Sequence, residues 1–306
     1  MTDGVSCGMS FALNAWGQAH LNRVEQALSD WIKTDAPAGL GAAMRYAVLD
    51  GGKRLRPLLV FAASEAVAGN AQASLRAACA TELIHAYSLV HDDLPCMDND
   101  VLRRGKPTVH VAFGEAQALL AGDALQALAF EFLTPEDGSI PAEVQAKLCR
   151  LLALAAGHDG MAGGQAIDLA SVGQVLSRDQ LQHMHRLKTG ALLQGSVMMG
   201  AACGASEGIT VQALNGLKAY GAALGLAFQV VDDILDVTAD SATLGKTAGK
   251  DAANDKPTYV SLLGLVGARH HAQELLHEAL NALASTGLPD THALQALADM
   301  VVNRNN

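Results

Sequence analysis

A narrow polar stripe on an otherwise apolar segment constrains the fold of this chain more than any other feature. Gln229, Asp232, Asp233 and Asp236 are spaced at i, i+3, i+4 and i+7, so a helix would place them along one line of its surface. The residues between them are apolar, whereas an amphipathic surface helix has a broader polar face. The stripe therefore either meets solvent as a thin strip or lines an interior cavity. Buried carboxylates are costly without partners, so such a cavity would need cations.

The rest of the chain also has helical rather than strand-like spacing. Half of the 306 residues are hydrophobic and aromatics make up only 4%, and a mixture rich in alanine and leucine favours helix. We expect a single all-α domain over residues 1–306, with ten or more helices and a loose tail at 1–10. Helices are predicted near 11–33, 44–49, 57–67, 74–93, 114–133, 141–156, 162–170, 177–203, 210–239, 256–266, 269–285 and 290–302, with a loop at 98–110.

Charge and cysteine content exclude several other classes of protein. The formal net charge is -10 and no basic run stands out, so no nucleic-acid partner is expected. The five cysteines are scattered without close pairing, which argues against a disulfide framework or a structural zinc site and fits a reducing cytoplasm. We find neither a signal peptide nor an apolar run long enough to cross a bilayer. A cytoplasmic protein without stable membrane insertion is therefore expected.

A second acidic cluster comprises Asp92, Asp93 and Asp98. The first two stand at the end of a predicted helix, ahead of Pro95, where the helix dipole disfavours anions by about 0.3–1 kcal/mol. Carboxylates gathered there are expected to bind a hard cation, and oxygen ligands suit Mg2+ better than zinc or copper. A solvated helix end is the alternative for either cluster alone. Two such clusters, both on strongly apolar helices, favour metal binding.

Cations gather in a few places although only 17% of the residues are charged. Lys53, Arg54 and Arg56 stand beside two glycines at a helix start, and Arg103 and Arg104 follow the first acidic cluster. Further candidates are Lys188 with its neighbour Thr189, and Lys246, Lys250 and Lys256. Arginine and lysine side chains bind phosphate oxygens, so these groups and the acidic clusters together predict diphosphate substrates. Any single lysine could instead be an ordinary surface residue.

On these residues the chain resembles the short-chain trans-prenyltransferases of the polyprenyl synthase family, most closely the bacterial farnesyl diphosphate synthases. The resembling segments are GGKRLRP at 51–57, IHAYSLVHDDLPCMDND at 84–100, LRRGKPT at 102–108, GDAL at 122–125, GMAGGQAIDL at 160–169, KTG at 188–190, FQVVDDILD at 228–236 and LGKTAGKD at 244–251. The resemblance implies the isoprenoid synthase fold, with helices around a central catalytic cavity, and a homodimer. It also implies Mg2+-dependent condensation of isopentenyl diphosphate with dimethylallyl or geranyl diphosphate.

The resemblance further implies a role for each matching residue. Three Mg2+ ions, for which Mn2+ could substitute, would be held by Asp92 and Asp98 on one wall and Asp232 on the other, with Asp93, Asp233 and Asp236 in support. The residues expected to serve the allylic diphosphate are Arg103, Lys188, Thr189, Gln229, Lys246 and Lys256. Those expected to hold isopentenyl diphosphate are Lys53, Arg56, His85 and Arg104. No role is assigned to Gln165, Asp168, Lys250 or Arg304.

The chemistry explains these residue types. Mg2+ makes the allylic diphosphate a leaving group, and the double bond of isopentenyl diphosphate attacks the allylic cation that forms. The departing diphosphate can accept the proton that is then lost. The carbonyl of Gln229 and the hydroxyl of Thr189 can stabilise the cation through oriented dipoles, while an apolar cavity excludes water.

Product length and three rival functions remain open from the sequence. Tyr87 lies five residues before Asp92, about 7.5 Å along a helix, and is predicted to form a cavity floor that limits the product to fifteen-carbon farnesyl diphosphate. Ordinary core packing of Tyr87 is the alternative, and a geranylgeranyl or geranyl diphosphate synthase would then be possible. A terpene cyclase would not need the second diphosphate site that GGKRLRP supplies. A non-catalytic modulating subunit would be expected to have lost aspartates.

Overall fold

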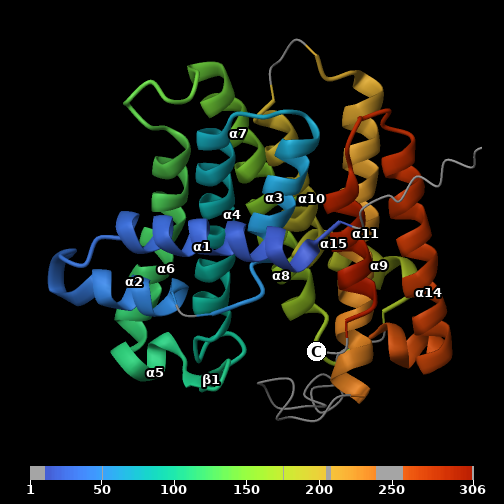
Figure 1. Cartoon of the computed structure of the whole chain (residues 1–306). Coiled ribbons are helices and arrows are strands. Elements are labelled where there is room, and N and C mark those ends of the chain that lie inside the picture. The colour runs from blue at the N-terminus through green and yellow to red at the C-terminus, as the bar shows by residue number, and fades with distance from the viewer. Residues whose placement is uncertain (1–10, 50, 175, 205–207, 239–257, 305–306) are drawn as a thin grey trace, which may run out of the picture.

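Helices build almost all of the structure (Figure 1). The computed structural model describes residues 11–49, 51–174, 176–204, 208–238 and 258–304. The elements in the first half are α1 (Leu13–Trp31), the short turn η1 (Pro37–Gly39), α2 (Leu40–Val48), α3 (Leu55–Ala66), α4 (Ala71–Asp92), β1 (Leu102–Arg103), β2 (Lys106–Pro107), α5 (Val109–Phe113) and α6 (Glu115–Leu133). The second half has α7 (Ala142–Ala156), α8 (Met161–Ala170), α9 (Arg178–His185), η2 (Arg186–Gly190), α10 (Ala191–Ala202), α11 (Val211–Thr238), α14 (Tyr259–Ala284) and α15 (His292–Val302). The predicted all-α class is confirmed.

The hydrophobic interior consists of two clusters that meet along α3 and α10. The first gathers buried side chains of α1, α2, α4, α6 and α7, and the second gathers those of α9, α11, α14 and α15. α10 takes part in both, since Met199 packs into the first and Val197 into the second. α3 does the same through Phe61 and Leu59. Helices α4 and α11, which carry the acidic clusters, therefore belong to opposite halves with α3 and α10 between them (Figure 1).

Two glycines allow helices to approach closely near the candidate site. At Gly200 in α10, an added Cβ would lie 2.3 Å from the carbonyl oxygen of Val60 in α3. At Gly225 in α11, an added Cβ would lie 2.7 Å from the Cα of Gly190, the last residue of η2. Packed backbone cannot yield to a side chain at such distances. The polar stripe of α11 is therefore held directly against η2.

Local signals place the ends of α4, whose last turn carries the first acidic cluster. The side-chain oxygen of Asn70 accepts hydrogen bonds from the backbone amides of Gln72 and Ala73, both at 2.9 Å, which caps the start of the helix. The helix ends at Asp92, and Pro95 follows. The helix predicted over 74–93 is thus confirmed, with a start three residues earlier.

Apart from shifts of a few residues at helix ends, such as the start of α2 at Leu40, three segments differ from the sequence prediction. The predicted loop at 98–110 contains a hairpin in which Leu102 pairs with Pro107 and Arg103 with Lys106; strands of two residues are too short to produce an alternating pattern. The helix predicted over 177–203 is divided by η2, a π-helical turn between α9 and α10, and such turns often mark functional sites. The two helices predicted over 256–266 and 269–285 form the single element α14, which Gly264 interrupts at a φ of 70°.

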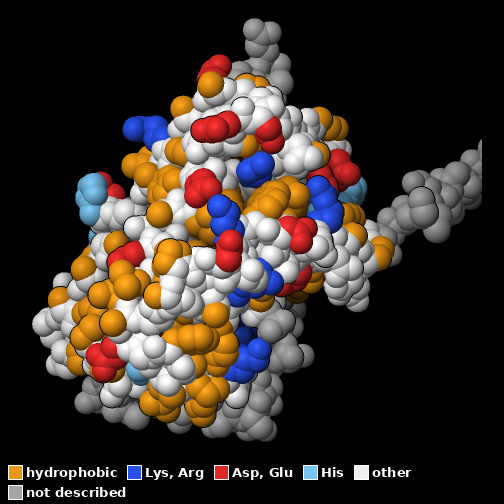
Figure 2. Space-filling model, turned by 90° about the vertical axis from the view of Figure 1, so that its left-hand side faces the viewer, with side chains coloured by type: hydrophobic (Ala, Val, Ile, Leu, Met, Phe, Trp, Pro, Cys, Tyr) orange, Lys and Arg blue, Asp and Glu red, His pale blue; other side chains and the backbone are white. Residues whose placement is uncertain are grey.

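The face that carries α5 and α6 exposes apolar side chains. Val111, Phe113, Leu119 and Leu120 have exposed fractions between 36% and 53%. Figure 2 shows hydrophobic patches on the side of the molecule where these helices lie, among scattered charges. Among the residues that the structure describes, no helix is both long enough and apolar enough to span a membrane.

Candidate active site

The first wall of the candidate site is the last turn of α4. The amide of Asp98 donates a 2.8 Å hydrogen bond to the carbonyl oxygen of Asp92, which folds the acidic segment back onto the helix end. Burial raises the pKa of Asp92 to about 6, and the charges of Asp98 and Asp93 add to this effect while Lys188 and Arg103 oppose it. Burial is thus the main reason why the charged form of Asp92 is disfavoured, and the neighbouring acids add to this effect.

Arg103 forms an ion pair with Asp93, the second aspartate of this cluster. Its Nε lies 3.0 and 2.9 Å from the two carboxylate oxygens of Asp93, and its Nη2 lies 2.6 Å from Oδ1. Asp93 is only 2% exposed, and burial raises its pKa although Arg103 works against that shift. Arg103 also lies 3.8 Å from Asp100. The hairpin after α4 is therefore tied back to the helix end, and Asp93 faces Arg103.

The second wall is the polar stripe of α11, and hydrogen bonds order it. The Thr189 hydroxyl donates to Oε1 of Gln229 at 3.1 Å, and the Gln229 amide donates to Asp233 at 2.9 Å. The other carboxylate oxygen of Asp233 accepts a 2.7 Å hydrogen bond from the backbone amide of Tyr259. This chain fixes the Gln229 carbonyl toward Thr189. Asp233 and Asp236 are buried, at 2% and 5% exposure.

The π-helical turn η2 carries Lys188 and Thr189 between the two walls. Lys188 Nζ lies 2.6 Å from a carboxylate oxygen of Asp168 in α8. A Cβ on Gly164 would lie 2.1 Å from the Lys188 backbone nitrogen, so α8 packs directly against η2. Asp168, to which the sequence assigned no role, therefore holds Lys188. Asp168 and Lys188 are twenty residues apart in the sequence, so no local pattern predicted this contact.

Arg304 reaches the second wall from the end of α15. Its guanidinium donates hydrogen bonds to the Asp232 carboxylate and, at 3.1 Å, to the carbonyl oxygen of Phe228. It also lies 4.1 Å from the centre of the Phe228 ring. Burial lowers the pKa of Lys53, the charge of Arg304 adds to this effect and that of Asp232 opposes it, which places Lys53 near the same pair. Arg304, to which the sequence assigned no role, therefore contacts the second wall directly.

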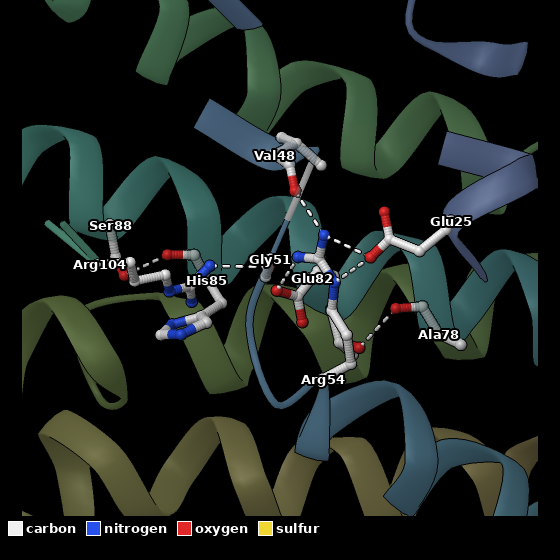
Figure 3. A network of polar contacts seen from close by, with 10 residues as sticks. Glu25, Val48, Gly51, Arg54, Ala78, Glu82, His85, Ser88 and Arg104 are labelled. Carbon is white, nitrogen blue, oxygen red and sulfur yellow. Dashed lines mark hydrogen bonds and ion pairs between the residues drawn. The ribbon is translucent and has the colours of Figure 1, made fainter. Parts of the chain in front are cut away.

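The residues expected to hold isopentenyl diphosphate come from α3, α4 and the hairpin. Burial lowers the pKa of Arg56 to about 10. Burial and the surrounding arginines lower the pKa of His85 well below its usual range, so the imidazole is neutral at neutral pH. Arg104 donates a 2.8 Å hydrogen bond to the carbonyl oxygen of Gly51. Figure 3 shows His85 and Arg104 beside the loop that leads into α3.

Tyr87 lies one turn before the first acidic cluster, on the side of α4 that meets α6. It is 9% exposed, and its ring packs edge-on against His91 with 5.7 Å between ring centres. Burial raises the pKa of its hydroxyl, and a hydrogen bond with Gln126 of α6 opposes that shift. The ring is therefore fixed between two helices.

The remaining predicted residues have no described placement. Lys246, Lys250 and Lys256 lie outside the described residues. Within the described ranges, no three carboxylate, imidazole or thiolate groups stand close enough to form a ready metal site. Arg103 and Arg304 each pair with an aspartate of the two walls, so guanidinium groups stand beside carboxylates at both.

Comparisons with known proteins show what the chain is similar to. The sequence model of the polyprenyl synthetase family matches residues 37–294. The chain is 51% identical to a probable farnesyl diphosphate synthase of Bradyrhizobium diazoefficiens over 89% of this chain and 82% of that protein. It is 44% identical to a chloroplastic geranylgeranyl pyrophosphate synthase of Catharanthus roseus over 98% and 84%. A crystal structure of Helicobacter pylori geranyltransferase with magnesium and isoprenyl diphosphate is similar with a TM-score of 0.82 and 36% identity, covering 96% of this chain and 98% of that one.

Proposed function

Because the chain belongs to the polyprenyl synthetase family, we propose that it is a farnesyl diphosphate synthase, a prenyltransferase acting as one catalytic domain over residues 1–306. It condenses isopentenyl diphosphate with dimethylallyl or geranyl diphosphate and releases diphosphate. One observation carries the proposal. Carboxylates on α4 and α11 stand on either side of the turn that holds Lys188 and Thr189, and a separate group of cations stands at the start of α3. Two diphosphates need two such groups.

The carboxylate walls fit Mg2+. The raised pKa of Asp92, which burial and neighbouring acids cause, marks negative charge that a hard cation would relieve. Asp92, Asp98 and Asp232 would hold three ions together with oxygens of the allylic diphosphate, and Mn2+ could replace them. When bound, the metal neutralises the diphosphate and lowers the barrier to its departure. The crystallised Helicobacter pylori geranyltransferase contains magnesium, which supports this choice.

The residues of the chain bind, orient and shield the reactants. Lys188, held by Asp168, binds the allylic diphosphate, while Lys53, Arg56 and Arg104 bind isopentenyl diphosphate. The C–O bond of the allylic substrate breaks, the isopentenyl double bond forms the new C–C bond, and the released diphosphate takes the proton. Gln229 Oε1 and the Thr189 hydroxyl, ordered by Asp233, direct their dipoles at the allylic cation.

Tyr87 supports a fifteen-carbon product. Its ring is held between α4 and α6 about one helical turn beyond the metal wall, and close packing would resist a further isoprene unit. Relatives that carry the names of farnesyl and geranylgeranyl synthases are both close to this chain. The identity to probable farnesyl diphosphate synthases is the higher of the two, so the longer product is not favoured.

Two further observations support a homodimer and a cytoplasmic compartment. The apolar face at α5 and α6, with Leu119 and Leu120 about half exposed, supports a homodimer that covers it, since monomers rarely expose large apolar patches. Free thiols at Cys79, Cys96 and Cys149 fit the reducing cytoplasm.

A single incubation tests the function. Purified protein is mixed with labelled isopentenyl diphosphate, an allylic diphosphate and Mg2+, and the dephosphorylated products are separated by chromatography. The expected result is farnesol, formed only when both substrates and the metal are present. Cyclised hydrocarbons from the allylic substrate alone would identify a terpene cyclase. Complete inactivity of the folded protein would instead favour a modulating subunit.

A further inference from the structure

One cation of the GGKRLRP segment points away from the site. Lys53 and Arg104 are exposed and Arg56 is half-buried, whereas Arg54 is only 4% exposed. Arg54 stands directly before α3 with a φ of 47° and a ψ of 35°. An arginine in this left-handed region persists only where its surroundings hold it. The buried side chain is therefore the feature that fixes the backbone between Lys53 and Arg56.

Three elements hold the Arg54 guanidinium (Figure 3). Glu82 in α4 accepts a 2.6 Å hydrogen bond from Nη1, and Glu25 in α1 accepts one of 2.7 Å from Nε. The carbonyl oxygen of Val48, the last residue of α2, accepts a third of 2.5 Å from Nη2. Both carboxylates raise the pKa of Arg54, although burial acts to lower it. With its nitrogens engaged in this way, Arg54 faces protein groups and cannot also bind a diphosphate.

The Arg54 clamp, formed by Arg54 with Glu25, Glu82 and the Val48 carbonyl, is connected to the predicted isopentenyl residues. Glu82 lies three residues before His85, so both stand on the same face of α4. On the other side of the loop, Arg104 donates a hydrogen bond to the Gly51 carbonyl. A Cβ at Gly52 would lie 2.8 Å from a guanidinium nitrogen of Arg104. The loop at Gly51 therefore lies between Arg104 and Arg54 and passes close to Arg104 (Figure 3).

Glu82 also balances the charges of this region. It is 3% exposed, and its carboxylate acts to raise the pKa of Arg54, Arg56 and Arg104 against the effect of burial. The positive charge of Arg104 repels that of Arg56, and this repulsion acts to lower the pKa of Arg56. One buried carboxylate thus permits several arginines to stand together where a diphosphate would bind.

We propose that Arg54 and Glu82 are positioning residues for isopentenyl diphosphate, and this inference rests on the proposed function. Glu82 holds Arg54, Arg54 fixes the turn before α3, and the turn directs Lys53 and Arg56 toward one diphosphate. The allylic site uses Lys188, Thr189 and the two acidic walls, none of which contacts the clamp in the described residues. Because the described hydrogen bonds of Arg54 reach only Glu25, Glu82 and Val48, loss of the clamp should weaken isopentenyl binding more than allylic binding.

Glu82→Gln is the decisive variant, because it keeps the shape of the side chain and removes its charge. We expect KM for isopentenyl diphosphate to rise about tenfold or more while KM for geranyl diphosphate changes less than about twofold. A change confined to one substrate is not a consequence of lost stability, since partial unfolding lowers turnover without regard to substrate. An unchanged isopentenyl KM, or equal rises in both constants, overturns the inference.

Two further variants complete the test. Arg54→Lys keeps a positive charge but loses the fork, so isopentenyl KM should rise about threefold or more, and this variant decides the matter if Glu82→Gln does not fold. Glu65→Gln is the matched control, because Glu65 also joins α3 to α1, through Trp16 at 2.8 Å and His20 at 2.9 Å. It should leave both KM values unchanged, and a selective rise in isopentenyl KM there would overturn the inference.

Measurements on the wild-type protein distinguish a failure of the proposed function from a failure of the positioning role of Arg54 and Glu82. If it does not condense isopentenyl and geranyl diphosphates with Mg2+ present, the proposed function fails. If it does condense them and the clamp variants keep the wild-type isopentenyl KM, only the positioning role of Arg54 and Glu82 fails.

Discussion

Arg304 donates a hydrogen bond to the carboxylate of Asp232 while its guanidinium lies over the ring of Phe228. Asp232 is the predicted metal ligand on α11, so a side-chain cation stands where a metal ion would have to approach. If Mg2+ binds to Asp232, Arg304 would have to leave this carboxylate or share it. The pair therefore predicts competition between an internal cation and the metal.

Arg304→Gln should lower the Mg2+ concentration needed for half-maximal activity by about two- to fivefold, as expected for a partly exposed ion pair. The measurement is a Mg2+ titration of initial rates at saturating substrates. Arg269→Gln is a suitable control, because Arg269 lines the same surface cleft as Arg304 but forms no described ion pair with Asp232. An unchanged or higher Mg2+ requirement in Arg304→Gln would contradict the competition.

Asp92→Asn should separate stability from activity. The pKa of Asp92 rises from 3.8 to about 6 in the folded protein, so the folded state binds this proton more tightly than the unfolded state. The stability linked to Asp92 is then fully present below pH 3.8 and is lost as pH rises through about 6. Without metal at pH 7.5, Asp92→Asn should therefore melt at a higher temperature than the wild type.

The same substitution should reduce turnover by orders of magnitude, because a carboxamide is a poor ligand for Mg2+. Melting curves at pH 4 and pH 7.5, measured on wild type and variant, isolate the Asp92 contribution from that of other carboxylates. A variant that is no more stable at pH 7.5, or one with near-normal turnover, would argue against the assigned role of Asp92.

Arg56 and Lys188 should affect different substrates. Arg56→Ala is expected to raise KM for isopentenyl diphosphate about tenfold, whereas Lys188→Ala should raise KM for the allylic diphosphate by a similar factor, as for a lost charge-assisted contact. Initial rates with each substrate varied in turn provide both constants. If Arg56→Ala changed only the allylic constant, the two diphosphate sites would have to be exchanged.

Tyr87→Ala should lengthen the product to twenty carbons or more, because removing the ring opens space beneath the growing chain. Tyr87→Phe is the control, since it keeps the ring and removes only the hydroxyl, and it should still give the fifteen-carbon product. Chromatography of dephosphorylated products measures both. A fifteen-carbon product from the alanine variant would remove Tyr87 as the floor.

Gly225→Ala should weaken both the fold and the site. The added methyl group would lie 2.7 Å from the Gly190 backbone, and overpacking of this kind costs about 1–3 kcal/mol in unfolding free energy. Because α11 would move away from η2, the hydrogen bond between Thr189 and Gln229 should lengthen. Urea denaturation measures the loss in stability, and wild-type stability together with wild-type turnover would contradict the close approach.

The sequence predicts those parts of the site that lie within one helix. The stripe from Gln229 to Asp236 follows from helical periodicity alone, and the end of α4 follows from Pro95. Contacts that depend on tertiary folding are different in kind. The hydrogen bonds from Arg103 to Asp93 form only because the hairpin folds back onto the end of α4. The Lys188–Asp168 ion pair forms only because α8 packs against a π-helical turn. No local pattern encodes either.

The segment with three cations shows the same limit. The sequence presents Lys53, Arg54 and Arg56 as equivalent donors beside two glycines, and their spacing cannot say which of them turns inward. Only the partners from α1 and α4 show that Arg54 is buried and ion-paired. Lys246 and Lys256 lie outside the described residues, so their assignment to the allylic substrate stays a prediction.

The division of the interior along α3 and α10 has a consequence for how such an enzyme can diverge. Tyr87 and the helices around it belong to one hydrophobic cluster, while α11 and its supporting helices belong to the other. If Tyr87 forms the floor of the cavity, substitutions that deepen or shorten the space beside it would be expected to repack mainly the first cluster. Product length would then be expected to vary through changes in one half of the molecule, while the residues on α11 that order Gln229 stay the same.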